Sequence, residues 1–87
     1  GHIIDTFVGH KSFVRSISWH PEGRRLASAA FGNNKIIIWD TETGEAELTL
    51  TGHTDWIYHV EWDASGTRLL SAAKDNTARI WQVNATP

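Results

Sequence analysis

Short apolar stretches rich in β-branched and aromatic residues recur about every ten residues along this chain. Between them stand turn-forming segments such as His20-Pro21-Glu22-Gly23, with Pro and Gly where a type I turn accepts them. No stretch has the periodicity of an amphipathic helix, so the pattern predicts an all-β fold of short antiparallel strands. The expected strands are Ile3–Val8, Phe13–Trp19, Arg25–Ala30, Lys35–Trp39, Glu45–Thr51, Trp56–Trp62, Arg68–Ala73 and Ala78–Val83.

The same strand pattern occurs twice. Gly9-His10 returns as Gly52-His53 after 43 residues, and Trp39 returns as Trp81 after 42. Further matched positions are Trp19 with Trp62, Gly23 with Gly66, Leu26 with Leu69, and Ser28-Ala29-Ala30 with Ser71-Ala72-Ala73. Repetition at about this period indicates a solenoid or a propeller, in which similar units pack on one another.

Composition adds mainly exclusions. With 40% hydrophobic and 21% charged residues, the chain has the make-up of a globular protein and not of a disordered one. The net charge is −2 and Lys and Arg are scattered singly, so we expect no nucleic-acid partner. No apolar run is long enough to cross a bilayer, so we expect no membrane partner. Cysteine is absent, which excludes disulfides and is compatible with a reducing compartment such as the cytoplasm.

With Gly-His near the start and Trp-Asp near the end of a four-strand unit, the sequence resembles the WD-repeat (WD40) family of β-propellers over its whole length. Gly9-His10 with Trp39-Asp40 is the full signature, and Gly52-His53 with Trp81-Gln82 carries Gln in place of Asp. The resemblance implies an all-β fold of WD40-type blades, two per chain with four antiparallel strands each. The two repeat units are expected at residues 1–43 and 44–87.

In this family, the strand before each Gly-His is the outermost strand of the preceding blade. By that register, Ile3–Val8 is an outer strand with no blade of its own, and Trp56–Val83 is a blade of three strands. We therefore expect Ile3–Val8 of one chain to complete the second blade of the next, in a ring closed by oligomerisation. Each chain contributes two blades, so we expect a homotetramer with eight blades, with a trimer of six as runner-up. Because methionine is absent even at position 1, we interpret the chain as a fragment, excised or designed as a building block of a symmetric propeller.

His53, Ser71 and Asp75 together have the residue types of a hydrolase triad. The resemblance implies a different role, because in the family these positions and Trp81 form a buried hydrogen-bond network. The first unit has the corresponding residues His10, Ser28, Asn33 and Trp39. We expect a structural role for both sets, and a weaker network in the first unit, since an amide cannot match the charge-assisted bonds of a carboxylate.

The histidines raise the question of a metal site. His2, His10, His20, His53 and His59 show none of the close ligand spacings of metal centres, so we expect no metal and no cofactor. His59 lies on an expected innermost strand, where ring symmetry could bring copies together, but we favour a solvated channel lining.

The resemblance also implies a top face, on which many WD-repeat proteins bind peptides. Residues at its expected positions are Phe13, Arg15, Phe31, Trp56, Tyr58 and Lys74. Aromatic residues and Arg suit a binding hot spot, but for Phe13 and Trp56 we favour packing between neighbouring blades, whereas for Arg15 and Tyr58 both roles stay open. Two functions follow: a self-assembling structural module without catalytic activity, or a scaffold that binds peptides or proteins on this face.

Overall fold

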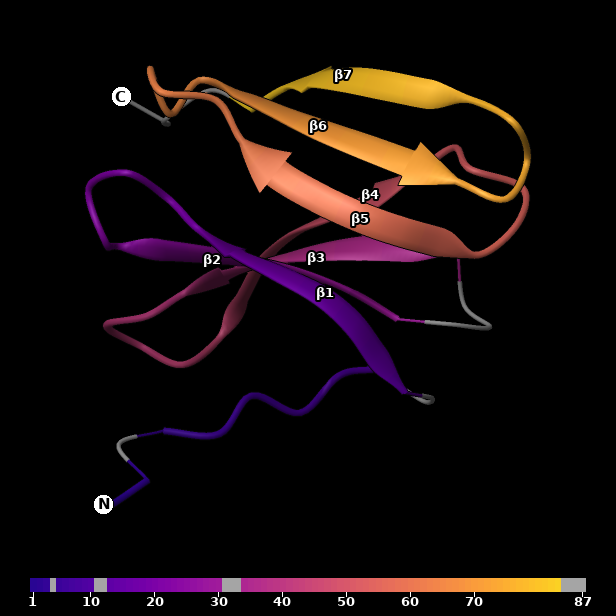
Figure 1. Cartoon of the computed structure of the whole chain (residues 1–87). Coiled ribbons are helices and arrows are strands. Elements are labelled where there is room, and N and C mark those ends of the chain that lie inside the picture. Colours follow the sequence, from indigo (N-terminus) through magenta and orange to yellow (C-terminus); the bar gives the residue numbers. More distant parts are fainter. Residues whose placement is uncertain (4, 11–12, 31–33, 84–87) are drawn as a thin grey trace.

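The computed structural model describes residues 1–3, 5–10, 13–30 and 34–83, which form two antiparallel sheets stacked face to face (Figure 1). Sheet 1 contains β1 (Val14–Trp19), β2 (Arg25–Ala30), β3 (Lys35–Asp40) and β4 (Ala46–Thr51), paired in chain order. Sheet 2 contains β5 (Ile57–Trp62), β6 (Arg68–Ala73) and β7 (Ala78–Gln82). The predicted all-β class is confirmed. The described residues include no helix, and hence none that could span a membrane.

The two sheets repeat each other in register as well as in sequence. Ser28 pairs with Ile17 on one side and Ile37 on the other, and Ser71 pairs with Val60 and Arg79 in the same way. Each inner hairpin also has a register shift at its start, between Val14 and Ser16 and between Ile57 and His59. A residue of one unit can therefore be assigned its structural counterpart in the other.

The turns that join the first two strands of each sheet depend on glycine. Gly23 and Gly66 have φ of 78° and 75°, a conformation that side chains other than glycine rarely adopt. Each donates its amide to the carbonyl three residues earlier, of His20 and of Asp63. Gly66 also lies against the ring of His20, whose Nε2 is 2.9 Å from the Gly66 carbonyl oxygen. This contact ties the turn of sheet 2 to sheet 1.

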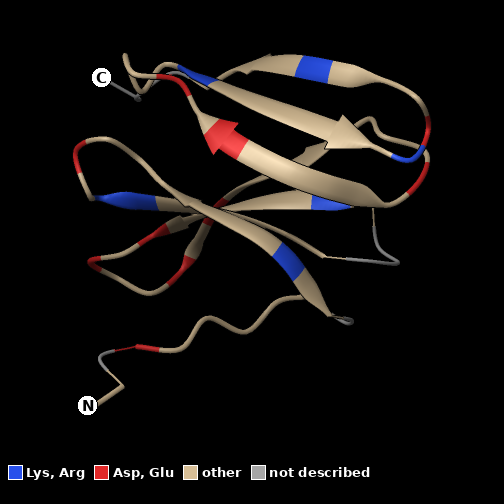
Figure 2. Cartoon of the chain, in the orientation of Figure 1, with Lys and Arg blue, Asp and Glu red and all other residues tan. Residues whose placement is uncertain are grey.

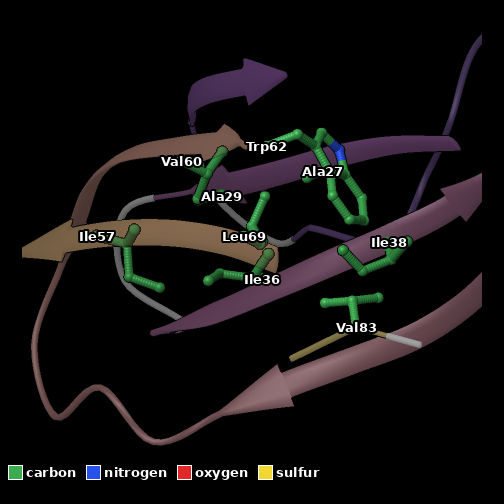
Figure 3. Close-up of a cluster of buried hydrophobic side chains, with 9 residues drawn as sticks. All are labelled: Ala27, Ala29, Ile36, Ile38, Ile57, Val60, Trp62, Leu69 and Val83. Carbon is green, nitrogen blue, oxygen red and sulfur yellow. The ribbon is translucent and has the colours of Figure 1, made fainter. Parts of the chain in front are cut away.

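The core lies between the sheets (Figure 3). Its buried members are Ala27, Ala29, Ile36 and Ile38 from sheet 1 and Ile57, Val60, Trp62, Leu69 and Val83 from the second unit. Small alanines on β2 allow the larger side chains of β5 and β6 to approach the sheet closely, as dense packing requires. Along the inner strands, Ser16 and Ser18 accept hydrogen bonds from the amides of Val60 and Trp62, each at 3.2 Å.

The expected eighth strand, Ile3–Val8, is not formed by the described residues of this segment, and Ile4 lies outside them. A strand needs a hydrogen-bonded neighbour, and neither sheet pairs one of its strands with this segment. Phe7 nevertheless packs on Trp39, with ring centroids 5.3 Å apart. Elsewhere the expected strand ends differ from the observed ones by single residues, as at Phe13, Asp40 and Val83.

Charged residues of both signs are spread over the two sheets and their turns (Figure 2). Arg25 of β2 and Glu47 of β4 form a partly shielded ion pair at 2.7 Å, which spans β3. The pair of Arg24 with Glu42 is exposed and contributes little to stability.

Candidate functional site

Each Gly-His pair is placed by a tryptophan. A Cβ atom at Gly9 would lie 2.8 Å from the indole of Trp39, and one at Gly52 would lie 3.0 Å from that of Trp81. The distance at Gly9 is too short for a real side chain, and the distance at Gly52 would require the indole to shift slightly. Glycine thus lets the chain cross the indole edge, and this brings the following histidine onto the serine of the second strand.

In the second unit, all four expected residues meet. Trp81 donates its indole N–H to the Ser71 hydroxyl oxygen at 2.8 Å, and Ser71 lies 2.6 Å from His53 Nε2. His53 Nδ1 lies 2.9 Å from the Asp75 carboxylate, which also accepts the amides of Thr54 and Thr77 at 3.0 and 2.9 Å. Asp75 further accepts a short bond from the Thr77 hydroxyl.

One set of proton positions satisfies this whole chain of bonds. The indole can only donate, so the Ser71 oxygen accepts from Trp81 and its own proton goes to His53 Nε2. His53 then carries its proton on Nδ1 and donates it to Asp75. The hydroxyl–imidazole–carboxylate geometry is that of a hydrolytic triad. However, Ser71 and His53 are buried, and the hydroxyl oxygen already accepts a hydrogen bond from the indole N–H. The arrangement suits stability better than attack on a substrate.

Asp75 is strongly biased toward its ionised form. The Thr77 hydroxyl bond, assisted by His53 and by the amides of Thr54 and Thr77, holds the pKa of this carboxyl far below its usual range. At the opposite end of sheet 2, in the turn between β5 and β6, the bond from the Ser65 hydroxyl and the contacts with Arg68 lower the pKa of Asp63 to about 2. Both carboxylates close turns, so their ionised forms hold the hairpin geometry.

In the first unit, His10 Nε2 lies 2.7 Å from the Ser28 hydroxyl, which accepts the Trp39 indole N–H at 2.8 Å. His10 is only half-buried, whereas His53 is buried. Burial lowers the pKa of His10, and its bond with Ser28 opposes that change. Asn33, the expected counterpart of Asp75, lies outside the described residues.

The expected top-face residues come together only in part. Lys74 Nζ lies 4.9 Å from the ring centre of Trp56, a cation–π contact, and the Lys74 amide donates to the Trp56 carbonyl at 2.8 Å. Trp56, Tyr58 and Phe13 are all exposed, so neither Phe13 nor Trp56 is packed between these two sheets. Arg15 is exposed at the position that corresponds to Tyr58, and Phe31 lies outside the described residues.

The described histidines contact a variety of partners. Within the described ranges, no three His, Asp, Glu or Cys side chains lie close enough to hold a metal ion. His20 bonds to Gly66 and packs edge-on against Trp62, with ring centroids 4.8 Å apart. This contact between the units was not expected from the sequence, and neither were the bonds from Ser16 and Ser18. His59 is exposed and lies 3.4 Å from Glu61 on the same strand.

The networks can be tested by removing their histidines. His53→Ala removes the acceptor of the buried Ser71 hydroxyl proton and one donor to Asp75, which we expect to cost on the order of 1–3 kcal/mol for each bond lost from a buried group. His10→Ala should cost less, because His10 is less buried and the sequence has Asn33 where the second unit has Asp75. Urea unfolding at one fixed protein concentration measures both, with His2→Ala as control. Equal losses for the two variants would contradict the expected difference.

Asp75 also predicts an acid dependence. Its folded pKa is depressed, so below the ordinary aspartate pKa of about 3.9 the unfolded chain binds protons that the folded chain refuses. The stability that Asp75 contributes is therefore present above about pH 4 and is lost as pH falls toward the folded pKa. Unfolding curves between neutral and acidic pH should show a shallower acid loss for Asp75→Asn than for the parent. The slope that remains comes from groups such as Asp63.

A structural Ser71 also predicts chemical inertness. A fluorophosphonate probe, which labels activated serine nucleophiles, should leave the folded chain unmodified. Labelling of Ser71 that disappears in His53→Ala would show instead that the hydroxyl is a nucleophile.

Comparison with known proteins agrees with this geometry. The family described as WD domain, G-beta repeat, matches residues 1–40 and 44–82. Over 43 residues the chain is 44% identical to the probable cytosolic iron-sulfur protein assembly protein Ciao1 of Culex quinquefasciatus. That alignment covers 49% of this chain and 12% of the relative, so the chain spans only a small part of that protein. Since both of its units match the same repeat, the chain belongs to the WD40 family of β-propeller proteins.

Proposed function

We propose that the chain is a self-assembling structural module that closes a β-propeller from several copies and has no catalytic activity. WD40 repeats build β-propellers that act as protein-interaction scaffolds and are generally non-catalytic. This chain supplies two units of that fold. The proposal adds that the neighbours of these units are further copies of the same chain.

The observation that carries the proposal is that, among the described residues, β7 pairs with β6 alone, whereas β3 pairs with both β2 and β4. In sheet 1, β4 pairs along β3, with Ile37 opposite Thr49 and Ile36 opposite Leu50. Residues 3–8 precede Gly9-His10 as β4 precedes Gly52-His53, so they are the counterpart of β4. If residues 3–8 pair along β7 of another copy in the register that β4 has along β3, Thr6 lies opposite Arg79 and Phe7 opposite Ala78. Residues 3–8 would then gain the partner that they lack within one chain.

Ring size follows from the two units per chain. Heterologous contacts close into a ring when the rotation permits, and propellers have about four to eight blades. Four blades would crowd inner strands that carry Trp19, Trp62 and His59. Between six and eight blades we favour eight, from four copies, because large aromatic residues between blades suit a wide ring. Six blades from three copies is the second choice.

A peptide-binding scaffold is the other candidate function. The exposed Phe13 and the Trp56–Lys74 contact favour it, since exposed aromatic residues beside a cation are common in binding hot spots. The two functions are compatible, because the assembled ring would present this surface once per chain. A peptide array probed with the assembled ring, and with Trp56→Ala as control, would identify such binding.

Native mass spectrometry of the 87-residue chain tests the assembly directly. We expect a species of four chain masses, and we expect it to vanish when residues 1–8 are removed, since the fourth strand is then lost. Three chain masses would keep the strand exchange and correct the ring size. A stable monomer, or a ring that survives the deletion, would refute the exchange.

The exchanged strand can also be trapped, because the chain has no cysteine of its own. In Thr6→Cys/Arg79→Cys, the proposed register sets the two thiols opposite each other on one side of the sheet, within disulfide range. We expect covalent oligomers on non-reducing gels. Thr6→Cys/Ala78→Cys is the matched control, because adjacent strand residues point to opposite faces and this pair should not crosslink.

A further inference from the structure

The repeat defines two outer faces that correspond to the two faces already joined inside the chain. Within the chain, one face of sheet 1 packs on one face of sheet 2. The counterparts of these joined residues form two outer faces. The outer face of sheet 2 consists of His59, Glu61, Leu70, Ala72, Ala78 and Ile80. The outer face of sheet 1 consists of Ile17, Trp19, Leu26, Ile37 and Trp39.

Burial differs sharply between counterparts. Val60 and Trp62 are 1% and 6% exposed, whereas Ile17 and Trp19 at the same positions of sheet 1 are 59% and 60% exposed. Ile38 is fully buried, and its counterpart Ile80 is 68% exposed. An exposed Trp beside branched aliphatic residues is unusual for a free surface and typical of an interaction site.

The outer face of sheet 2 also keeps the hydrocarbon content of its buried counterpart. The buried set is Ala27, Ala29, Ile36 and Ile38, and the exposed set is Leu70, Ala72, Ala78 and Ile80. Both contain two alanines and two isomeric six-carbon residues, because Ala27 becomes Leu70 while Ile36 becomes Ala78. Volume-conserving exchanges of this kind are tolerated in packed cores. On this face lies a largely apolar hollow of about 330 Å³.

The polar residues at the edge of this face differ in type, but each can accept a hydrogen bond. Ser16 and Ser18 accept the amides of Val60 and Trp62 inside the chain. Their counterparts are His59 and Glu61, which are exposed and lie against each other. The amides that correspond to Val60 and Trp62 are those of Ile17 and Trp19, which share the same register with β2.

We infer that the outer face of sheet 2 receives the outer face of sheet 1 of a second copy, with Glu61 accepting the amide of Trp19 of the partner subunit. This inference rests on the self-assembly proposed above and specifies the contact that drives it. An unprotonated ring nitrogen of His59 accepts the amide of Ile17 of the partner subunit, as Ser16 accepts that of Val60 within the chain. The carboxylate of Glu61 makes a charge-assisted bond where Ser18 makes a neutral one, so the contact between chains depends on charge and the contact within the chain does not.

Sedimentation of full-length variants tests the assignment, because the altered residues are exposed in the single chain. Glu61→Ser copies Ser18 and keeps a neutral acceptor, so it should assemble more weakly than the parent but more strongly than Glu61→Val. Glu61→Val has no acceptor, leaves the partner's amide unpaired and should raise the dissociation constant by about tenfold or more. Ile80→Asp places a charge in the apolar contact and should abolish assembly. Glu22→Val, in an exposed turn, is the control for the loss of one negative charge.

The outcomes separate the two proposals. If Glu61→Val and Ile80→Asp assemble like the parent while the Thr6–Arg79 crosslink still forms, the face contact is wrong and the self-assembly stands. If the parent chain is a monomer that forms no crosslink, both are wrong. Urea unfolding under dissociating conditions checks folding: Glu61→Val and Glu22→Val should unfold like the parent, so that a weaker assembly cannot be mistaken for a misfolded chain.

Discussion

The fold depends on sheet faces that must be covered on both sides. A sheet of three or four short strands cannot be stable with an apolar face in water, and here each sheet covers one face of the other. Ala27 and Ala29 allow a close approach, while Val60, Trp62 and Leu69 fill the space between the sheets. Because this contact uses one face of each sheet, the remaining faces determine what the chain can bind.

The hydrogen-bond networks belong to this packing. Trp81 and Trp39 are large rings that pack beside glycines, and each carries one donor that must be satisfied when buried. The serine oxygen satisfies it, the histidine satisfies the serine, and in the second unit Asp75 fixes the orientation of the histidine. The same residue types can catalyse hydrolysis when the hydroxyl is accessible, so burial distinguishes the two roles here.

Much of the fold and of the hydrogen-bond network could be predicted from the sequence, because the same pattern occurs twice in the chain. Two aligned copies separate the structural signal of Gly52, His53 and Trp81 from chance, and alternating apolar residues place the strands to within single residues. The segment Ile3–Val8 was predicted as a strand, but its described residues form none in the single chain, because a local apolar pattern does not specify whether a neighbouring strand is present. The contact of His20 with Gly66 and the cation–π pair of Trp56 with Lys74 join residues whose proximity depends on how sheets and turns lie in space, and no local pattern signals either.

The replacement of Ala27 and Ile36 in the first unit by Leu70 and Ala78 in the second has a consequence for how the gene can change in length. Each unit keeps the same hydrocarbon content on this face, acceptor side chains on its first strand and a glycine in the turn that follows, whereas Asp63 stands in the second unit where His20 stands in the first. Recombination between the two copies in a gene would change the chain by whole units and conserve the apolar part of the face. It would alter the polar part, because Ser16 and Ser18 are replaced by His59 and Glu61.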